Sequence, residues 1–266
     1  MKFKERNIEN TEWITNFFVN NEFVYFVDSL PGEKSNLSKI SIKNLEENLK
    51  IKGDLNRTFL ANPCLTDNNS LLEITQTDLE YIGQYDEYVQ NYLVLKNNEI
   101  ISFVIDNKVV TKNVTKNLET SARVLDVWEN NLLCNFENQL VVMNLDFEVL
   151  KKLDINAQMA VVFESNIFVL DENNDVWEIN DFSQKTRLDL EKGFKKIFWV
   201  NKCNLLISNF ENEVSKIINT HTKNQEIFYK QTINRAVMVN KDLMMCLCLD
   251  SKKTPTYSKN LLKFIF

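Results

Sequence analysis

RVLDVWENNLLCNFENQLVVMNLDFEVLKKLDI, residues Arg123–Ile155, divides into four short apolar runs separated by polar turns. The runs are Val124–Glu129, Leu132–Phe136, Gln139–Leu145 and Phe147–Leu153. Each run is rich in Val, Leu, Phe or Trp and is bounded by Asn, Asp or Glu, residues that suit tight turns. The stretch therefore predicts four antiparallel strands that follow one another in order.

The same plan recurs along the whole chain. Its marker is the first apolar residue after the first turn, and the marker returns at intervals of 32 to 42 residues, at Phe23, Leu65, Ile100, Leu132, Ile167, Leu205 and Leu243. A four-stranded sheet has two apolar faces and cannot bury both alone, so repeats of this size stack against one another. The seven repeats span the 266 residues, which predicts a single domain over residues 1–266.

The repeat resembles the WD40-type seven-bladed β-propeller over essentially the whole chain. In that family Trp-Asp ends the third strand of each blade and Gly-His precedes the first. The Trp-Asp position here holds Leu145-Asp146, Ile179-Asn180, Ile218-Asn219 and Ile74-Thr75, and no His follows Gly53, Gly83 or Gly193. The resemblance implies an all-β, WD40-like propeller of seven four-stranded blades without the family's Asp-His-Ser/Thr-Trp hydrogen-bond network. A β-sandwich or two stacked barrels are the alternative folds.

The last repeat has a less regular pattern. We expect its strands at Ile233–Val239, Leu243–Leu249, Thr254–Ser258 and Asn260–Phe266, the last being the outer strand. The charged residues 1–9 are expected to lie over the surface or to add to this last blade.

Composition limits the classes of function. The net charge is −6 with a pI near 5.1, and an acidic chain is a poor general binder of nucleic acid because phosphate contacts need a basic surface. No apolar run reaches 18 residues, so no membrane-spanning helix is expected, and Met1–Arg6 shows no secretory signal. The five cysteines are an odd number, and most are expected to lie in strands and face a core as buried free thiols, which predicts an intracellular protein, cytoplasmic or nuclear.

Candidate chemical groups are few. His221 is the single histidine and lies between two threonines in an expected loop, so a solvated loop residue is favoured over a catalytic base. Cys246 and Cys248 would share one face of a strand and pack in the core. Asp171–Asp175 matches the start of a calcium loop, but Val176 and Phe182 occupy the diagnostic Gly and Glu positions, so a hairpin turn is expected.

The remaining charged groups also favour structural interpretations. Acidic pairs such as Glu46-Glu47 and Asp86-Glu87 are interpreted as solvated loop charge rather than as glycosidase acids. Lys192, Lys195 and Lys196 could contact phosphate, but a role in surface solubility is favoured. The sequence predicts no catalytic residue, no metal ligand and no cofactor.

The favoured function is a non-catalytic platform for protein interactions, or a structural subunit of an intracellular complex. The alternatives are a propeller factor associated with the ribosome or RNA, and an enzyme with its site in a central channel, for which Asp126 is the clearest carboxylate. The expected partners are one or more proteins, with a basic patch as the complement of the acidic loops. Direct contact with nucleic acid stays open.

Two loops depart most from the minimal repeat and are the predicted partner-binding surface. In WD40 topology both lie on the face that gathers the connections between second and third strands and between successive blades. The first, Asp28–Asn36, carries Glu33 and Lys34. The second, Gly83–Tyr88, carries Tyr85, Asp86, Glu87 and Tyr88. Tyrosine offers apolar area and a hydroxyl at low entropic cost, and the acids would attract a basic partner.

Overall fold

The structure is a computed structural model of the chain, and it describes a subset of the residues. Side chains are described in parts of 14–51 and over most of 122–248. The described backbone covers residues 2–5, 14–19, 22–28, 35–43, 48–55, 58–59, 64–66, 70–74, 79–84, 89–94, 100–104, 108–110, 115–117, 122–128, 130–163, 166–180, 182–201, 203–240, 242–249 and 258–265.

The described elements are β-strands joined by turns, with no helix among them, and most form four-stranded antiparallel sheets in chain order. The first meander consists of β2 (Ile14–Val19), β3 (Phe23–Asp28), β4 (Ser35–Ser41) and β5 (Asn48–Leu55). The second has β6 (Thr58–Phe59), β7 (Cys64–Thr66), β8 (Ser70–Ile74) and β9 (Leu79–Gln84). The third has β10 (Val89–Val94), β11 (Ile100–Val104), β12 (Lys108–Val110) and β13 (Thr115–Asn117).

Three further sheets repeat this order. The first has β14 (Ala122–Trp128), β15 (Asn131–Phe136), β16 (Gln139–Met143) and β17 (Val149–Leu153). The next has β18 (Ala157–Phe163), β19 (Asn166–Asp171), β20 (Val176–Asn180) and β21 (Gln184–Arg187). The last has β22 (Lys195–Asn201), β23 (Asn204–Asn209), β24 (Val214–Asn219) and β25 (Gln225–Tyr229). These sheets confirm the predicted four-strand repeat, because each marker residue lies in the second strand of its meander.

The seventh repeat uses both ends of the chain. Its strands are β26 (Ile233–Asn240), β27 (Leu243–Leu249), β28 (Ser258–Ile265) and β1 (Lys2–Glu5). β1 pairs antiparallel with β28 from Lys2↔Ile265 to Glu5↔Leu262. β28 also pairs with β2 at Ile14↔Ser258, so the first and last meanders form one eight-stranded sheet. Of the two expectations for residues 1–9, addition to the last blade is confirmed for Lys2–Glu5, and residues 6–9 lie outside the described part.

The prediction of Asn260–Phe266 as an outer strand is wrong, because β28 lies between β27 and β1. β28 takes the third place in this repeat, the place predicted for Thr254–Ser258; residues 254–257 lie outside the described part, and Ser258 begins β28. The physical reason is edge protection. An apolar strand with both edges paired cannot aggregate through an open edge, whereas the lysine-containing β1 suits an outer position.

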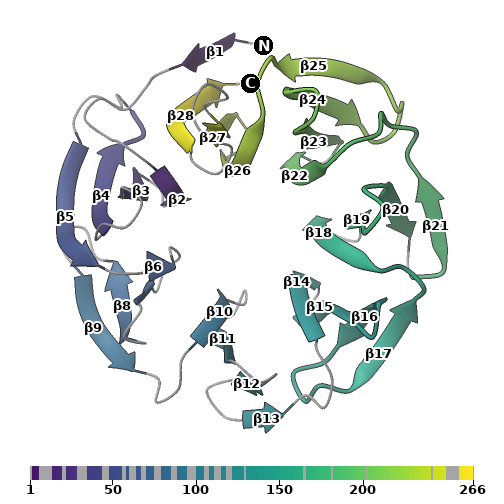
Figure 1. Cartoon of the computed structure of the whole chain (residues 1–266), viewed down its shortest axis with the longest axis horizontal. Helices are drawn as coiled ribbons and strands as arrows, with labels where there is room; N and C mark the ends of the chain where they lie inside the picture. Colours follow the sequence, from purple (N-terminus) through teal and green to yellow (C-terminus); the bar gives the residue numbers. More distant parts are fainter. Residues whose placement is uncertain are drawn as a thin grey trace. The chain divides into compact units, whose positions relative to one another are not determined.

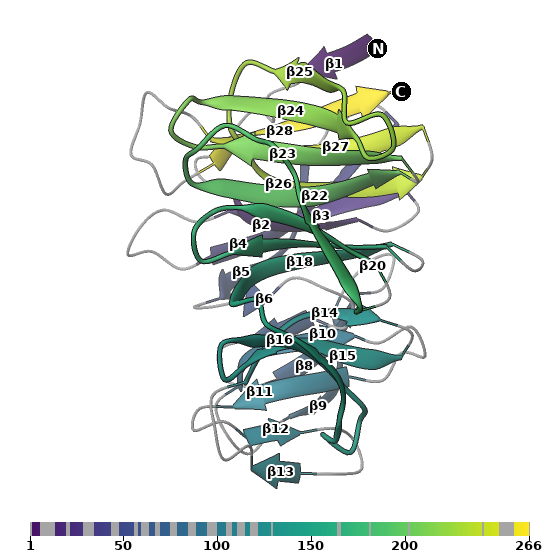
Figure 2. The same cartoon turned by 90° about the vertical axis from the view of Figure 1, so that its right-hand side faces the viewer.

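The residue contacts divide the chain into two compact units. Unit 1 is Met1–Val94 with Ile233–Phe266, and unit 2 is Leu95–Thr232. Within unit 2, Figure 1 shows β14, β18 and β22 side by side along one edge of the stacked sheets, with β17, β21 and β25 along the opposite edge. Figure 2 shows the same sheets one above another. The single domain over residues 1–266 stays a prediction.

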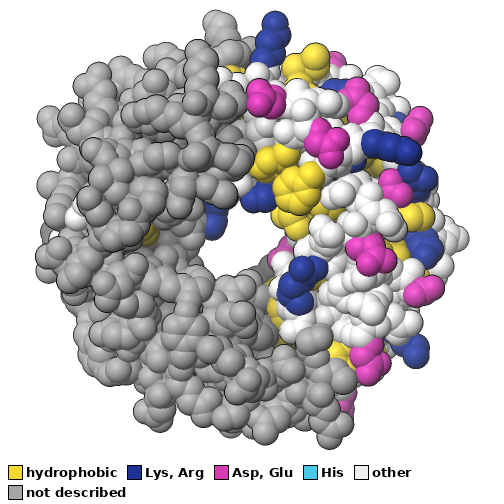
Figure 3. All heavy atoms as spheres, in the orientation of Figure 1, with side chains coloured by type: hydrophobic (Ala, Val, Ile, Leu, Met, Phe, Trp, Pro, Cys, Tyr) yellow, Lys and Arg dark blue, Asp and Glu magenta, His cyan; other side chains and the backbone are white. Residues whose placement is uncertain are grey.

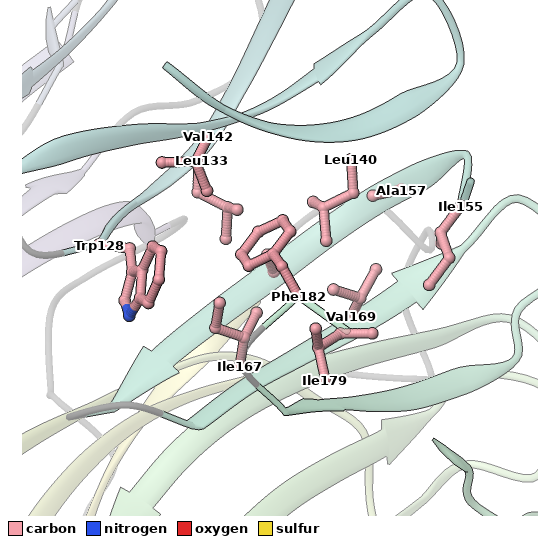
Figure 4. Packing of buried hydrophobic residues seen from close by; sticks show 11 residues of the cluster. Trp128, Leu133, Leu140, Val142, Ile155, Ala157, Ile167, Val169, Ile179 and Phe182 are labelled. Atoms are coloured by element: carbon pink, nitrogen blue, oxygen red, sulfur yellow. The ribbon is translucent and has the colours of Figure 1, made fainter. Parts of the chain in front are cut away.

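The core of unit 2 lies between its stacked sheets. Alternate residues of β15 point to opposite faces, so Leu133 packs toward the sheet of β18 and β19 while Leu132 and Cys134 pack on the other side. Figure 4 shows the first of these layers, in which Trp128 and Phe182 lie with ring centroids 5.4 Å apart. A second layer joins Phe168 and Leu170 of β19 to Ile197, Leu205, Ile207 and Ile218. Burial on both faces explains the nearly continuous apolar sequence of the middle strands.

Unit 1 has a comparable core within its eight-stranded sheet. Ile14, Phe17, Val24 and Phe26 are buried together with Met245 and Leu247 of β27. Cys246 and Cys248 on the same strand are buried free thiols, as predicted. In unit 2, burial raises the pKa of the Cys134 thiol to about 12.

Asparagine takes the place of glycine in several of the described turns, where three of the eight non-glycine residues with positive φ are Asn. Glu137 and Asn138, the two residues between β15 and β16, both have positive φ, as a two-residue type I′ hairpin requires. Asn130 and Asn174 also have positive φ. Asn tolerates this conformation better than other residues with a side chain, so the chain can make tight turns with few glycines.

Candidate functional site

The six predicted partner-binding residues cannot be compared with the structure. Glu33 and Lys34, as well as Tyr85, Asp86, Glu87 and Tyr88, lie outside the described residues. Their role stays a prediction. The described part of unit 2 contains the same kinds of connection.

In unit 2, connections between second and third strands meet connections between successive sheets. The Glu172 N–H donates to the carbonyl oxygen of Asn156 at 3.0 Å, and the Phe210 N–H donates to that of Phe194 at 2.9 Å. Arg123 and Asn135 donate to the Ala157 carbonyl oxygen at 2.6 and 2.7 Å. We call this end of unit 2 the junction face, formed by residues 137–138, 154–156, 172–175, 188–194, 210–213 and 230–232.

The junction face is acidic. Within these residue ranges the exposed carboxylates outnumber the exposed ammonium groups by seven to two: they are Glu137, Asp154, Glu172, Asp189, Glu191, Glu211 and Glu213, against Lys192 and Lys230. Three further exposed cations border the face, because Arg123, Lys185 and Arg187 bind Ala157, Asp154 and Asp175. Figure 3 looks onto this face and shows carboxylates spread over the described part, with an apolar patch over the start of β22. This end of unit 2 therefore repels anions and attracts cations.

Asp171 holds the turn between β19 and β20. Its Oδ1 accepts the N–H groups of Asn173 and Asp175, both at 2.9 Å, and its Oδ2 accepts the indole N–H of Trp177 at 2.9 Å. The side chain is buried at 7% exposure. Asp171–Asp175 is therefore the expected hairpin turn, with the Asp171 carboxylate used for structure.

We expect Asp171→Ala to lower the free energy of unfolding by roughly 2–4 kcal/mol, since hydrogen bonds to a charged group contribute roughly 1.5–3 kcal/mol each and are not additive. Urea denaturation followed by tryptophan fluorescence measures this loss. Asp189→Ala, an exposed control on the same face, should stay within about 0.5 kcal/mol of the parent chain. Equal stability of the two variants would contradict the structural role of Asp171.

A polar groove lies beside this turn, between the sheets that begin at β14 and β18. Its volume is about 320 Å³, and its lining is Asn138, Asp154, Ile155, Asn156, Asp171, Glu172, Asn173, Trp177 and Lys185. Asn156 donates to Glu172 Oε2 at 2.7 Å, and Lys185 Nζ donates to the Asp154 carbonyl oxygen at 2.8 Å. The groove offers amide and carboxylate groups suited to hydrogen bonding with a polar ligand.

The apolar patch consists of Phe194 and Phe210. Phe194 is 43% exposed, and the two rings meet edge to face with centroids 5.0 Å apart. Glu211 Oε1 accepts the Phe194 N–H at 3.2 Å. Gly193 has φ of +120°, and a Cβ there would come within 2.9 Å of Glu211 Oε2, so glycine is needed at this position. The backbone thus holds the aromatic pair in a defined place.

The three lysines near Gly193 separate in space. Lys195 is buried at 3% exposure and donates to the carbonyl oxygens of Asn174 and Gly193 at 3.0 and 2.9 Å. Burial lowers the pKa of Lys195, against the opposing influence of nearby Asp175 and Glu211. Lys196 lies over the Phe210 ring, and Lys192 is exposed. The alternative interpretation of this cluster as a phosphate contact gains no support from this arrangement.

The other sequence candidates also have structural surroundings. Asp126 is half-buried, with Oδ1 accepting the N–H of Val127 at 2.8 Å and Oδ2 that of Val162 in β18 at 2.9 Å. The carboxylate therefore links the first strands of two neighbouring sheets. His221 is exposed in the β24–β25 connection, as expected, and its backbone N–H donates to Asn219 Oδ1 at 3.1 Å.

Sequence reasoning missed the junction-face groove and the Phe194–Phe210 pair. One signal was present: Phe210 occupies a turn, where a large apolar residue is unusual. The described part of the chain contains no cluster of three His, Cys, Asp or Glu side chains that could hold a metal ion. Its described residues also include no helix that could span a membrane.

The comparisons with known proteins establish the fold. No protein-family model and no curated protein matches the sequence. Among solved structures, the chain is similar to YCF48 bound to D1 peptide, with TM-score 0.71, 9% identity, and coverage of 99% of this chain and 95% of that one. Sqt1 of Saccharomyces cerevisiae gives TM-score 0.65 and 10% identity, with 95% and 84% covered.

A third similar structure is PorZ of Porphyromonas gingivalis, described as an essential bacterial surface component of the type-IX secretion system. Its TM-score is 0.69 at 10% identity, with 98% of this chain covered. The chain spans only 38% of PorZ. Together with the four-stranded sheets, these likenesses show that the chain has a β-propeller fold.

Proposed function

We propose that this chain is a non-catalytic β-propeller that binds protein partners and serves as a platform within a complex. The observation that carries the proposal is the junction face of unit 2. Hydrogen bonds between neighbouring connections hold it in place, and it presents an aromatic pair, in which Phe194 is exposed and Phe210 half-buried, among carboxylates. Rigid scaffolds commonly bind through such connecting segments, and aromatic side chains are enriched at interfaces.

The fold comparison supports the same proposal. YCF48, which has the same fold, was solved with a bound peptide. Asp126 is the clearest carboxylate for the alternative of an enzyme. Asp126 and Asp171 both accept hydrogen bonds from other groups of the protein, and these structural roles favour binding over catalysis. The expected partner is a protein with a basic surface, in keeping with the excess of carboxylates on the junction face.

The experiment is affinity purification of the tagged full chain under native conditions, followed by reassembly from the purified chain and each identified partner. The proposal expects a stable complex of defined stoichiometry. The same purified chain should show no turnover in a broad hydrolase assay with a panel of divalent metals. Robust turnover, or the absence of any partner that binds in the reassembly, would refute the platform.

The proposal also places the chain inside the cell, in the cytoplasm or nucleus. The buried free thiols Cys134, Cys246 and Cys248 support a reducing compartment. Cell fractionation with the native source measures the location directly, and recovery of the chain outside the cytoplasm and nucleus would overturn this part of the proposal.

A further inference from the structure

The Phe194–Phe210 pair is an apolar surface with a fixed orientation. Phe194 directly precedes β22 and Phe210 directly follows β23, so the hydrogen bond between their backbones sets the position of both rings. Lys196 Nζ lies 5.6 Å from the Phe210 ring centroid. Phe194 remains 43% exposed, which leaves apolar area for a partner to cover.

The charges beside the pair have one predominant sign. On the two connections that carry the rings, residues 188–194 and 210–213, the exposed charged residues are Asp189, Glu191, Glu211 and Glu213 against Lys192. Two of these carboxylates, Glu191 and Glu211, already make contacts within the protein. Glu191 pairs with Lys216 at 2.7 Å, which lowers the pKa of Glu191, and Glu211 accepts the Phe194 N–H.

The other two carboxylates are available. Among the described residues, no side chain or backbone group pairs with the carboxylate of Asp189 or of Glu213, and both residues are exposed. An apolar contact whose two connecting segments carry exposed carboxylates complements a segment in which basic residues flank an apolar one. Glu213 follows Phe210 in the same turn, whereas the Asp189 carbonyl oxygen accepts from Gln225 on the outer strand β25 at 2.9 Å. A second copy of this chain is disfavoured as the occupant, because each copy carries a net charge of −6.

We propose that the Phe194–Phe210 pair with Asp189 and Glu213 is the docking site for a basic segment of a partner protein that carries an aliphatic or aromatic anchor residue. The anchor packs on the exposed side of Phe194, and lysine or arginine residues on either side face the carboxylates. This inference rests on the proposed platform function and names the chemistry of the partner. Nucleic acid is disfavoured, because phosphate would face the same carboxylates.

The test uses three synthetic peptides and the isotope-labelled full chain. The basic anchored peptide is acetyl-Lys-Leu-Lys-Phe-Lys-amide. The acidic peptide has Glu in place of each Lys, and the anchorless peptide has Ser in place of Leu and Phe. Amide chemical shifts map the site, and titration gives the affinity. The basic anchored peptide should shift residues 188–194 and 209–214 and bind at least about threefold more tightly than either other peptide.

Matched variants separate the site from general surface effects. Phe194→Ser should weaken binding of the basic anchored peptide about tenfold, because it removes the apolar contact. Ile227→Ser, at an exposed position on β25, should leave binding unchanged. Glu213→Gln should weaken binding about twofold and Glu226→Gln, also exposed on β25, should not. If Phe194→Ser is unstable, the binding affinity of Glu213→Gln still tests the site, because Glu213 is exposed.

Equal binding of all three peptides, shifts confined to other residues, or full affinity in both Phe194→Ser and Glu213→Gln would overturn the docking site. Stronger binding of a single-stranded RNA than of the basic anchored peptide at these residues would also overturn it. These results differ from failure of the platform itself, in which the native purification captures no protein. If a captured partner binds Phe194→Ser and Glu213→Gln with the affinity of the parent chain, the platform function is retained and the docking site is refuted.

Discussion

Deletion of residues 2–9 is expected to lower the stability of the protein by roughly 2–6 kcal/mol. The deletion removes β1, which pairs with β28 at four positions, and each backbone hydrogen bond contributes roughly 0.5–1.5 kcal/mol. It also leaves the edge of β28 unpaired from Leu262 to Ile265, which favours aggregation. Such a loss is a large part of a typical total stability of roughly 5–15 kcal/mol.

Thermal melting and urea denaturation of the deleted chain measure this loss. A synthetic peptide of residues 1–9, added in excess, should restore part of the stability because it can refill the edge of β28. A peptide of the same composition in scrambled order serves as the control. If the deleted chain melts at the temperature of the full chain, the pairing of β1 with β28 does not stabilise the protein and the assignment is wrong.

Phe168→Ala should lower the free energy of unfolding by roughly 3–5 kcal/mol. Phe168 lies in the middle strand β19, is 1% exposed, and packs in the layer shared with the sheet of β22 and β23. Its removal leaves a cavity between two sheets that the surrounding strands cannot close without breaking their own pairing.

The matched control is Ile227→Ala on the outer strand β25, where the side chain is 62% exposed. This variant should stay within about 0.5 kcal/mol of the parent chain. Urea denaturation followed by circular dichroism compares the two. A loss below about 1 kcal/mol for Phe168→Ala would show that the sheets do not share a close-packed layer at this residue.

Most of the strand order follows from local sequence. The middle strands are apolar because both of their faces are buried, so Leu132–Phe136 and Asn204–Ser208 could be recognised without any knowledge of their neighbours. Some of the turns carry Asn in positions of positive φ, as at Asn174. Periodicity and turn chemistry therefore predict the four-strand repeat.

The seventh repeat could not be predicted in the same way. Lys2–Glu5 is short and charged, and no local pattern shows that it pairs with Ser258–Ile265, more than 250 residues away. The apolar sequence of Leu261–Phe266 does indicate a strand. Whether such a strand lies inside a sheet or at its edge depends on a partner that local sequence does not specify.

The candidate site shows a similar limit. The kinds of connection expected to bind a partner could be named from the repeat, but Glu33, Lys34 and Tyr85–Tyr88 lie outside the described residues. The Phe194–Phe210 pair arises from antiparallel pairing of β22 with β23, which brings residues 16 positions apart into contact. Lys195 is a residue for which the sequence suggests the wrong environment. Its charge suggests a surface residue, yet two backbone carbonyl oxygens satisfy it in a buried position.

The most direct test of the platform is equilibrium binding of the purified partner to the full chain and to Phe194→Ser, with Ile227→Ser as control and circular dichroism to verify folding. We expect a complex with the parent chain and with Ile227→Ser, and about tenfold weaker binding to Phe194→Ser. Identical affinity for all three chains would contradict the docking site on the junction face. Failure of the purified partner to bind the parent chain would contradict the platform function itself.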